Sequence, residues 1–136
     1  MQLDLSEKEY RQLLDLVYIG NWVLNSTRGD DRFQDYDDLE SKLFGKCQNT
    51  PMKALVETWQ GVPYPSQAYT NGGIHEAIAY YEDGVFYEIL AEELSRRDMN
   101  YPEITEQNMP EIQNRMEDYL EEFRLNGLDH FTLEET

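Results

Sequence analysis

Two pairs of glutamates have a spacing that could bind a metal ion. Glu88 and Glu92 form one pair, Glu117 and Glu121 form the other, and the members of each pair are four residues apart. Side chains at this spacing are neighbours on one face of a helix. If the two helices faced each other, the four carboxylates would offer the oxygen ligands that Mg²⁺ prefers. The commoner interpretation of charges at helical spacing is a solvated helix face.

The paired glutamates resemble the acidic metal ligands of all-α nucleotide pyrophosphatases of the MazG type, which bind Mg²⁺ between paired helices. The resemblance implies a divalent-metal-dependent nucleotide hydrolase in which the same four glutamates are the ligands. The family's ExxE and ExxD elements are not matched in these segments, and no basic cluster is placed to bind a triphosphate. The enzyme is therefore kept as the alternative function.

Other residues typical of catalysis are scarce. His75 and His130 are the only histidines, and the chain has no Gly-rich phosphate loop, nucleophile elbow or zinc-ligand pair. His75 follows Gly72-Gly73 at the start of a predicted helix, where backbone amides could bind an anion. The alternative, which we favour, is an ordinary first-turn histidine exposed to solvent.

The strongest signal in the sequence is its negative charge. The chain of 136 residues has 28 acidic and 11 basic residues, for a net charge of -17. This balance excludes the phosphate-neutralising surface of ordinary nucleic-acid binding and argues against binding to anionic lipid. It favours solubility, cation binding or a basic partner, although a solvated acidic surface is the commoner case. We therefore predict a non-enzymatic protein without a cofactor that binds a basic protein, one form of which would be a nucleic-acid-mimicking inhibitor of a nucleic-acid-binding protein.

The acidic residues concentrate in two segments. Asp30 to Glu40 contains a cluster of carboxylates, and residues 99–136 have a charge of -8, because ten acidic residues stand against two basic ones. Carboxylates along exposed helices would present rows of negative charge to the partner. The residues predicted to bind it are Asp35, Asp37, Asp38, Glu117, Asp118, Glu121 and Glu122.

Periodicity predicts one all-α domain over residues 1–136, a compact bundle of four to five helices. Leu13 to Leu24 is apolar all round, which predicts a central helix surrounded by protein, and Gly20 in it suggests close approach of another helix. Ser6 and Glu9 fit a capping box at its start. The predicted helices span 6–26, 31–47, 51–60, 74–98 and 110–126, the fourth continuous through Asp83-Gly84, and no β-hairpin is expected.

A predicted loop at residues 61–73 carries two large side chains, Tyr64 and Tyr69. Pro63 and Pro65 exclude a helix there, and a loop of this length is often functional. The alternative is that both tyrosines cover the end of the core. A further hypothesis is a dimer formed through exposed aromatic residues, namely Tyr64, Tyr69, Tyr80 and Phe86.

Two segments, Tyr18 to Asn25 and Tyr80 to Asp98, resemble a group of small acidic helical bacterial proteins of no assigned function. The shared features are an aromatic pair, two spaced leucines and a closing Arg-Asp in the long helix. The resemblance implies a bacterial or phage origin and no particular activity. The sequence shows neither a signal peptide nor a membrane span, so we expect a cytoplasmic protein, and the single cysteine, Cys47, is expected to be a small buried hydrophobe.

Overall fold

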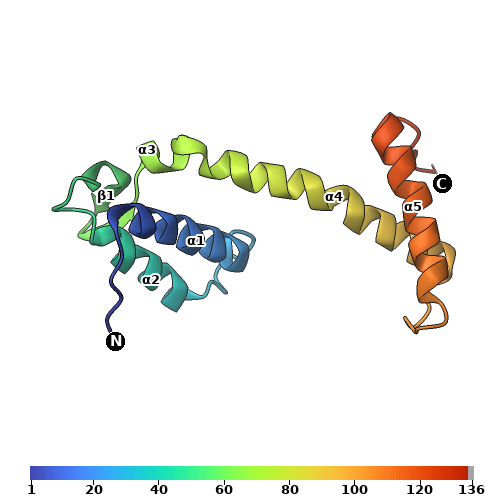
Figure 1. The fold of residues 1–136 in the computed structure, drawn as a ribbon, viewed down its shortest axis with the longest axis horizontal. Helices are drawn as coiled ribbons and strands as arrows, with labels where there is room; N and C mark the ends of the chain where they lie inside the picture. The colour runs from blue at the N-terminus through green and yellow to red at the C-terminus, as the bar shows by residue number, and fades with distance from the viewer. Residues whose placement is uncertain (135–136) are drawn as a thin grey trace. The chain divides into compact units, whose positions relative to one another are not determined.

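The computed structural model describes residues 1–134, which are mostly helical and include one two-stranded antiparallel sheet (Figure 1). The helical fold class is thus confirmed, whereas the sheet was not expected. The chain divides into two units, Met1–Ile78 (unit 1) and Ala79–Thr136 (unit 2), with the boundary inside helix α4 (His75–Asp98). The single domain remains a prediction.

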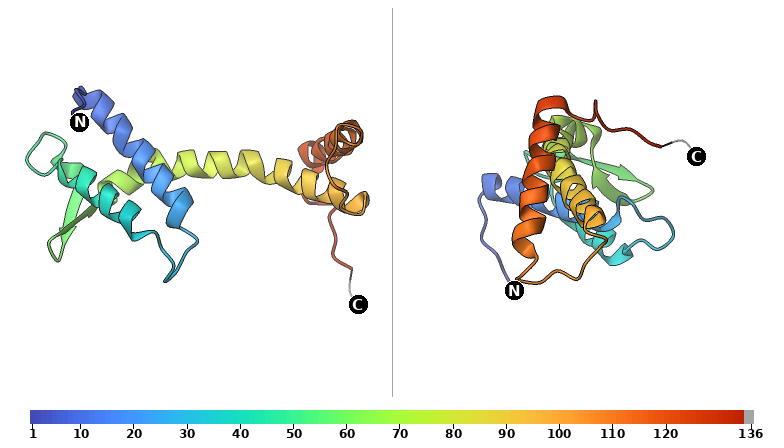
Figure 2. Two further views of the ribbon diagram at one scale, coloured as in Figure 1. Left: turned by 90° about the horizontal axis from the view of Figure 1, so that it is seen from below. Right: turned by 90° about the vertical axis from the view of Figure 1, so that its right-hand side faces the viewer.

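Unit 1 begins with two neighbouring helices, α1 (Glu7–Asn25) and α2 (Gln34–Gly45) (Figures 1 and 2). The predicted capping box is confirmed, because the Glu9 amide donates to Ser6 Oγ at 3.1 Å and the Ser6 amide donates to the Glu9 carboxylate at 3.1 Å. Both helices agree with the predicted ranges 6–26 and 31–47, although α2 starts three residues later than predicted.

A β-hairpin stands where the third helix was predicted. A short 3-10 turn, η1 (Lys53–Leu55), leads into strands β1 (Val56–Trp59) and β2 (Val62–Pro65), which pair antiparallel. Gln60 and Gly61 join them with φ of 50° and 79°, and two successive positive φ values suit the twist of a two-residue hairpin turn. The predicted helix 51–60 and the expected absence of a hairpin are therefore wrong. A two-stranded sheet has only edge strands, so it tolerates the two prolines of β2.

The rest of the predicted 61–73 loop is a helical entry to α4. Helix α3 (Gln67–Tyr69) continues into a π-helical turn, η2 (Thr70–Ile74), where Gly73 has a φ of 109°. That backbone conformation is accessible to glycine at little cost. Helix α4 then runs without a break through Asp83-Gly84, which confirms the continuous helix predicted for 74–98.

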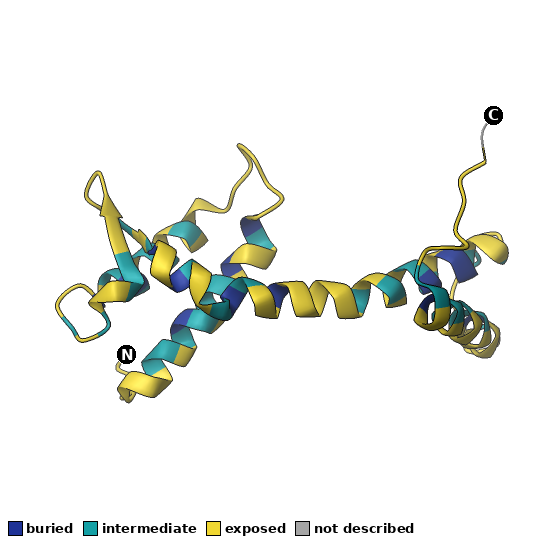
Figure 3. Ribbon diagram, turned by 90° about the horizontal axis from the view of Figure 1, so that it is seen from above, coloured by how far each residue is buried: buried dark blue, intermediate teal, exposed yellow. Residues whose placement is uncertain are grey.

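The core of unit 1 draws on elements distant in sequence. Its buried residues come from α1, α2, the segment after α2 and the α3–η2 turn, and they are Leu14, Phe44, Cys47, Tyr69 and Ile74. Helix α1 is covered on one side only, since Leu16 and Val23 are 69% and 71% exposed (Figure 3). The prediction that protein surrounds this helix is wrong. No other element comes within 4 Å of the position that a Cβ would take at Gly20, so the close approach expected there is also wrong.

Unit 2 contains the C-terminal part of α4 and helix α5 (Met109–Asn126), which packs across it (Figure 2). Ala91 and Leu94 of α4 and Phe123 of α5 form the buried cluster. Gly127 caps α5, with a φ of 56° and its amide donating to the Phe123 carbonyl at 2.8 Å. This agrees with the predicted helix 110–126. Among residues 1–134, no helix combines the length and the apolar character that crossing a bilayer requires.

Candidate interaction surfaces

Asp37, one of the predicted partner-binding residues, is already bound within unit 1. Its two carboxylate oxygens accept hydrogen bonds from Arg32 Nε and Nη2, each at 2.9 Å, and Asn21 Nδ2 donates to it at 2.9 Å. The Arg32 hydrogen bond is the main reason that the pKa of Asp37 lies below its usual value. This carboxylate therefore joins α2 to α1 and offers little free charge to a partner.

The same network includes two buried asparagines of α1 that sequence reasoning missed. Asn25 Nδ2 donates to Asn21 Oδ1 at 2.7 Å, and Asn25 Oδ1 accepts from the Phe33 amide at 2.8 Å. Buried amides need such partners, because an unpaired polar group in the interior is costly. The signal in the sequence was a pair of asparagines four residues apart on one face of an otherwise apolar helix.

Glu40 lies beside this network and was also missed. Burial is the main cause that raises its pKa to about 7, and the nearby charge of Asp37 adds to the effect. Glu40 lines a cavity of about 390 Å³ between α2 and β2, together with Asp37, Asp38 and Tyr64. The structure thus brings three predicted residues, Asp37, Asp38 and Tyr64, to one pocket. Arg32 also lines it, so the pocket already contains a cation.

Tyr69 and Tyr64, predicted together as loop aromatics, have different environments. Tyr69 is 1% exposed, packs edge-on against Phe44 and donates its hydroxyl to Asp15 Oδ1 at 2.8 Å. Burial is the main cause that raises the pKa of Tyr69, and the hydrogen bond to Asp15 acts in the same direction. Tyr64 is exposed on β2. Only Tyr64 of this pair presents its ring to solvent.

His75 is half-buried against α1. Its Nε2 lies 2.6 Å from the Tyr18 hydroxyl, and its ring packs edge-on against Trp22 with centroids 4.8 Å apart. The interpretation of His75 as a solvent-exposed first-turn residue is therefore wrong. The histidine contacts connect the start of α4 to α1 within unit 1.

The predicted acidic residues of α5 divide into paired and unpaired carboxylates. Glu121 pairs with Arg124 at 2.7 Å, and Glu122 lies 2.6 Å from His130 Nδ1. Glu117 and Asp118 are exposed and make no ion pair within the part of the chain that the structure describes. Both precede another carboxylate by four residues, and like charges at this spacing repel each other.

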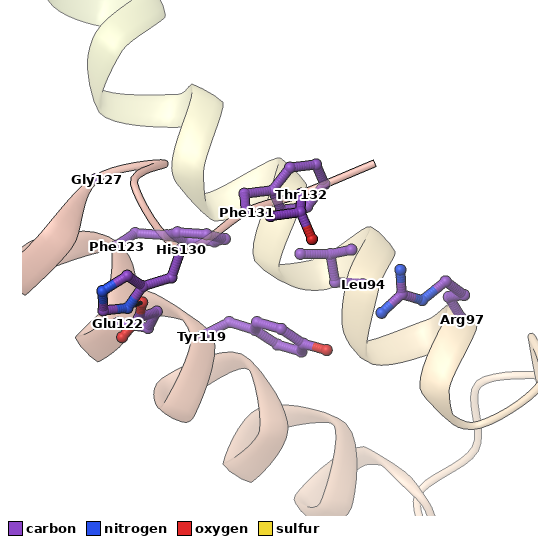
Figure 4. A pocket seen from close by; sticks show the side chains of 9 residues that line it. All are labelled: Leu94, Arg97, Tyr119, Glu122, Phe123, Gly127, His130, Phe131 and Thr132. Carbon is purple, nitrogen blue, oxygen red and sulfur yellow. Dashed lines mark ion pairs between the residues drawn. The ribbon is translucent and has the colours of Figure 1, made fainter. Parts of the chain in front are cut away.

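The C-terminal segment folds back over α5 and lines one side of a small open pocket in unit 2. Figure 4 shows His130 beside Glu122, with Phe131 over the opposite side of the cavity. The cavity measures about 260 Å³. Its lining is mostly aromatic and charged, with three other residues, and consists of Leu94, Arg97, Tyr119, Glu122, Phe123, Gly127, His130, Phe131 and Thr132.

The glutamates of the magnesium alternative do not form a metal-binding group. Across residues 1–134, no three histidine, cysteine, aspartate or glutamate side chains lie close enough to hold an ion. The structure therefore does not bring together the four predicted ligands, which are Glu88, Glu92, Glu117 and Glu121. Glu121 is bound instead to Arg124.

Comparison of the chain with protein-family models, with curated proteins and with solved structures finds no match in any of the three. A function for this protein is therefore inferred from the chemistry of its surface.

Proposed function

We propose that this protein is a non-enzymatic interaction protein whose exposed carboxylates bind a basic partner. The observation that carries the proposal is the excess of acidic side chains over internal cations. Within residues 1–134, arginine side chains pair with seven carboxylates and His130 contacts an eighth, whereas the sequence has 28 acidic residues. Negative charge of this density attracts a basic surface over a long range and accelerates its association.

Helix α5 supports the proposal most directly. Glu117 and Glu121, and Asp118 and Glu122, are like-charged pairs at i and i+4. Each such pair destabilises a helix by a few tenths of a kcal/mol, about 0.2–0.5. Lysine or arginine side chains of a partner would remove this repulsion on binding. The α5 face is defined here as Glu117, Asp118 and Glu121, the last of which pairs with Arg124 but, unlike Asp37, keeps an exposed side chain.

Helix α2 supplies a second, smaller set of carboxylates. Asp35 and Asp38 are exposed, whereas Asp37 is occupied by Arg32. We therefore assign partner binding on α2 to Asp35 and Asp38, and a structural role to Asp37.

Capture of the partner by variants with matched charge tests the proposal. The baits are the wild-type protein, the α5-face variant E117Q/D118N/E121Q, and the control D4N/E103Q/E106Q, which removes the same number of charges at exposed positions elsewhere. D35N/D38N tests the contribution of α2. A basic protein from the source cells should be retained by the wild type and the control, released at high salt, and bound at least about tenfold more weakly by the α5-face variant.

Equal retention by the α5-face variant, or retention that is indifferent to salt, would contradict the proposal. If the protein acts by mimicking nucleic acid, duplex DNA should compete with it for the captured partner. A partner that binds both at once would exclude mimicry and leave the basic interaction intact.

A further inference from the structure

Within unit 2, helix α4 has apolar side chains on two opposite faces. Its buried contacts with α5 come from Tyr87, Leu90, Ala91 and Leu94. Because successive residues turn about 100° around a helix, a second row of apolar side chains lies on roughly the opposite side from these contacts. This row is the outer stripe, which consists of Tyr81, Val85 and Ile89 at i, i+4 and i+8.

The outer stripe is largely open to solvent. Tyr81 is 65% exposed and Ile89 is 57% exposed, and Val85 is half-buried. Figure 3 shows the middle of α4 as almost continuously exposed. An amphipathic helix normally turns its apolar face toward other protein. A second apolar face without such cover is typical of an interaction site.

The charges beside the stripe are all negative. Glu82, Glu88 and Glu92 flank it on the helix surface, and none of the three forms an ion pair within residues 1–134. The sequence has no lysine or arginine from Ala54 to Ser95. Glu82 and Glu88 therefore have no lysine or arginine within one turn of the helix, and Arg96, four residues after Glu92, pairs with Glu93.

This charge pattern identifies the chemistry of the occupant. If a second copy of α4 packed on the stripe, acidic flanks would face acidic flanks, which is destabilising. We propose that the outer stripe binds a basic amphipathic helix of a partner protein, with apolar side chains on the stripe and lysines or arginines opposite the flanking glutamates. Helix-on-helix recognition of this kind uses apolar anchors at i, i+3, i+4 and i+7, and flanking charges select the partner.

The inference deepens the proposed function, because it gives the basic partner a second contact of defined shape. It does not depend on the α5 face. The two surfaces can therefore be tested and can fail separately.

Two synthetic amphipathic helices serve as probes. One carries leucines on one face and lysines on the other, and the second has glutamates in place of the lysines. Fluorescence anisotropy of the labelled peptides measures binding to the full chain. The lysine peptide should bind at least about tenfold more tightly than the glutamate peptide, and added salt should weaken its binding.

The stripe variant Y81Q/I89Q should lose at least about tenfold in affinity for the lysine peptide. Glutamine is a good helix former, so the helix itself is retained. The matched control is L16Q/L125Q, which replaces two helical apolar residues that are 69% and 62% exposed elsewhere. The control should bind the lysine peptide as the wild type does, and circular dichroism should show equal helix content in all three proteins.

Three results would overturn the inference. The first is no difference between the two peptides, including no binding of either. The second is an equal loss in the stripe variant and its control, which would indicate non-specific apolar contact. The third is a dimer in sedimentation experiments that Y81Q/I89Q abolishes, because the occupant would then be a second copy.

The α5-face variant separates this inference from the proposed function. If E117Q/D118N/E121Q binds the lysine peptide normally, the stripe acts by itself. If the captured partner binds the α5-face variant normally but does not bind the stripe variant, the proposed role of the α5 face is wrong and the inference about the stripe stands. If the α5 face is required and the stripe variant behaves as wild type, only the stripe inference fails.

Discussion

Units 1 and 2 satisfy their polar and charged groups in different ways. In unit 1, Asp37 is bound by Arg32 and Asn21, and Tyr69 donates to Asp15 from a buried position. In unit 2, the exposed carboxylates Glu117 and Asp118 have no ion-pair partner in the described chain. Unit 1 therefore includes buried side chains in its polar network, whereas the ion pairs of unit 2 lie at exposed or half-exposed positions.

The distribution of charge follows the same division. Unit 1 has 12 acidic and seven basic residues, for a net charge of -5, and unit 2 has 16 acidic and four basic residues, for -12. Unit 2 is also the shorter of the two. Repulsion of this size weakens a small folded unit, and a basic partner would relieve it. The comparison predicts that mutations of polar side chains lower the stability of unit 1 more than that of unit 2, because the polar side chains of unit 1 form internal contacts.

The largest effects are expected from the two core phenylalanines. F44A in unit 1 and F123A in unit 2 should each lower the free energy of unfolding by about 3–5 kcal/mol, since both rings are buried. Chemical denaturation should be followed by two signals. Tryptophan fluorescence reports unit 1, which contains both Trp22 and Trp59, and circular dichroism reports the helices of both units.

If the units unfold separately, F123A changes the circular dichroism transition and leaves the tryptophan transition in place. If F123A shifts both signals together, the chain unfolds as the single domain that the sequence predicts. Y80A, at a ring that is 83% exposed, is the control and should cost less than about 0.5 kcal/mol.

An intermediate loss of stability is expected when a tyrosine–aspartate hydrogen bond is removed, and each unit contains one such bond. Tyr69 donates to Asp15 in unit 1, and Tyr119 donates to Asp98 in unit 2. Y69F should lower the free energy of unfolding by about 2 kcal/mol, because a partly buried hydrogen bond to a charged group is lost. Y119F should cost less than about 1 kcal/mol, because solvent replaces the bond at its more exposed site. Equal losses of stability in Y69F and Y119F would contradict the difference between the units. Y64F is the control and should have no effect.

A smaller effect, with a defined pH dependence, is expected from Glu40. The folded protein keeps this proton up to about pH 7, whereas an ordinary glutamate releases it near 4.5. Unfolding therefore releases a proton between these values, and the contribution of Glu40 to stability is complete below about pH 4.5 and is lost as pH rises to 7.

E40Q removes this loss. At pH 8 the variant should be more stable than the wild type by about 1 kcal/mol, a value reduced for the partial exposure of the group. The difference should vanish in acid. Thermal or urea unfolding across pH measures it, with the exposed E103Q as the control. A constant difference at every pH would show that Glu40 acts through packing alone.

Local patterns in the sequence predicted the helices well. Ser6 and Glu9 specify the start of α1, and Gly127 specifies the end of α5, because a cap depends on residues only a few positions apart. The hairpin was missed because Met52, Leu55, Val56 and Trp59 also fit a helical period. Its Gln60-Gly61 turn lacks the Asn-Gly or Asp-Gly signal of a two-residue hairpin.

The surfaces were predicted less completely than the helices. Composition identifies the acidic segments, but the state of each carboxylate depends on tertiary neighbours. Asp37 forms an ion pair with Arg32 and accepts a hydrogen bond from Asn21 of α1, whereas Asp38 stays exposed one residue later. The raised pKa of Glu40 likewise requires burial that no local pattern encodes.

The run without lysine or arginine from Ala54 to Ser95 also determines which proteases can cut this region. Trypsin has no site along the exposed part of α4, while chymotrypsin meets Tyr80, Tyr81 and Phe86, all of them exposed. Cleavage of a helix requires it to open locally first. Chymotryptic cutting within this stretch therefore measures how often the middle of α4 unwinds, and protection from cutting would map a bound helix directly onto it.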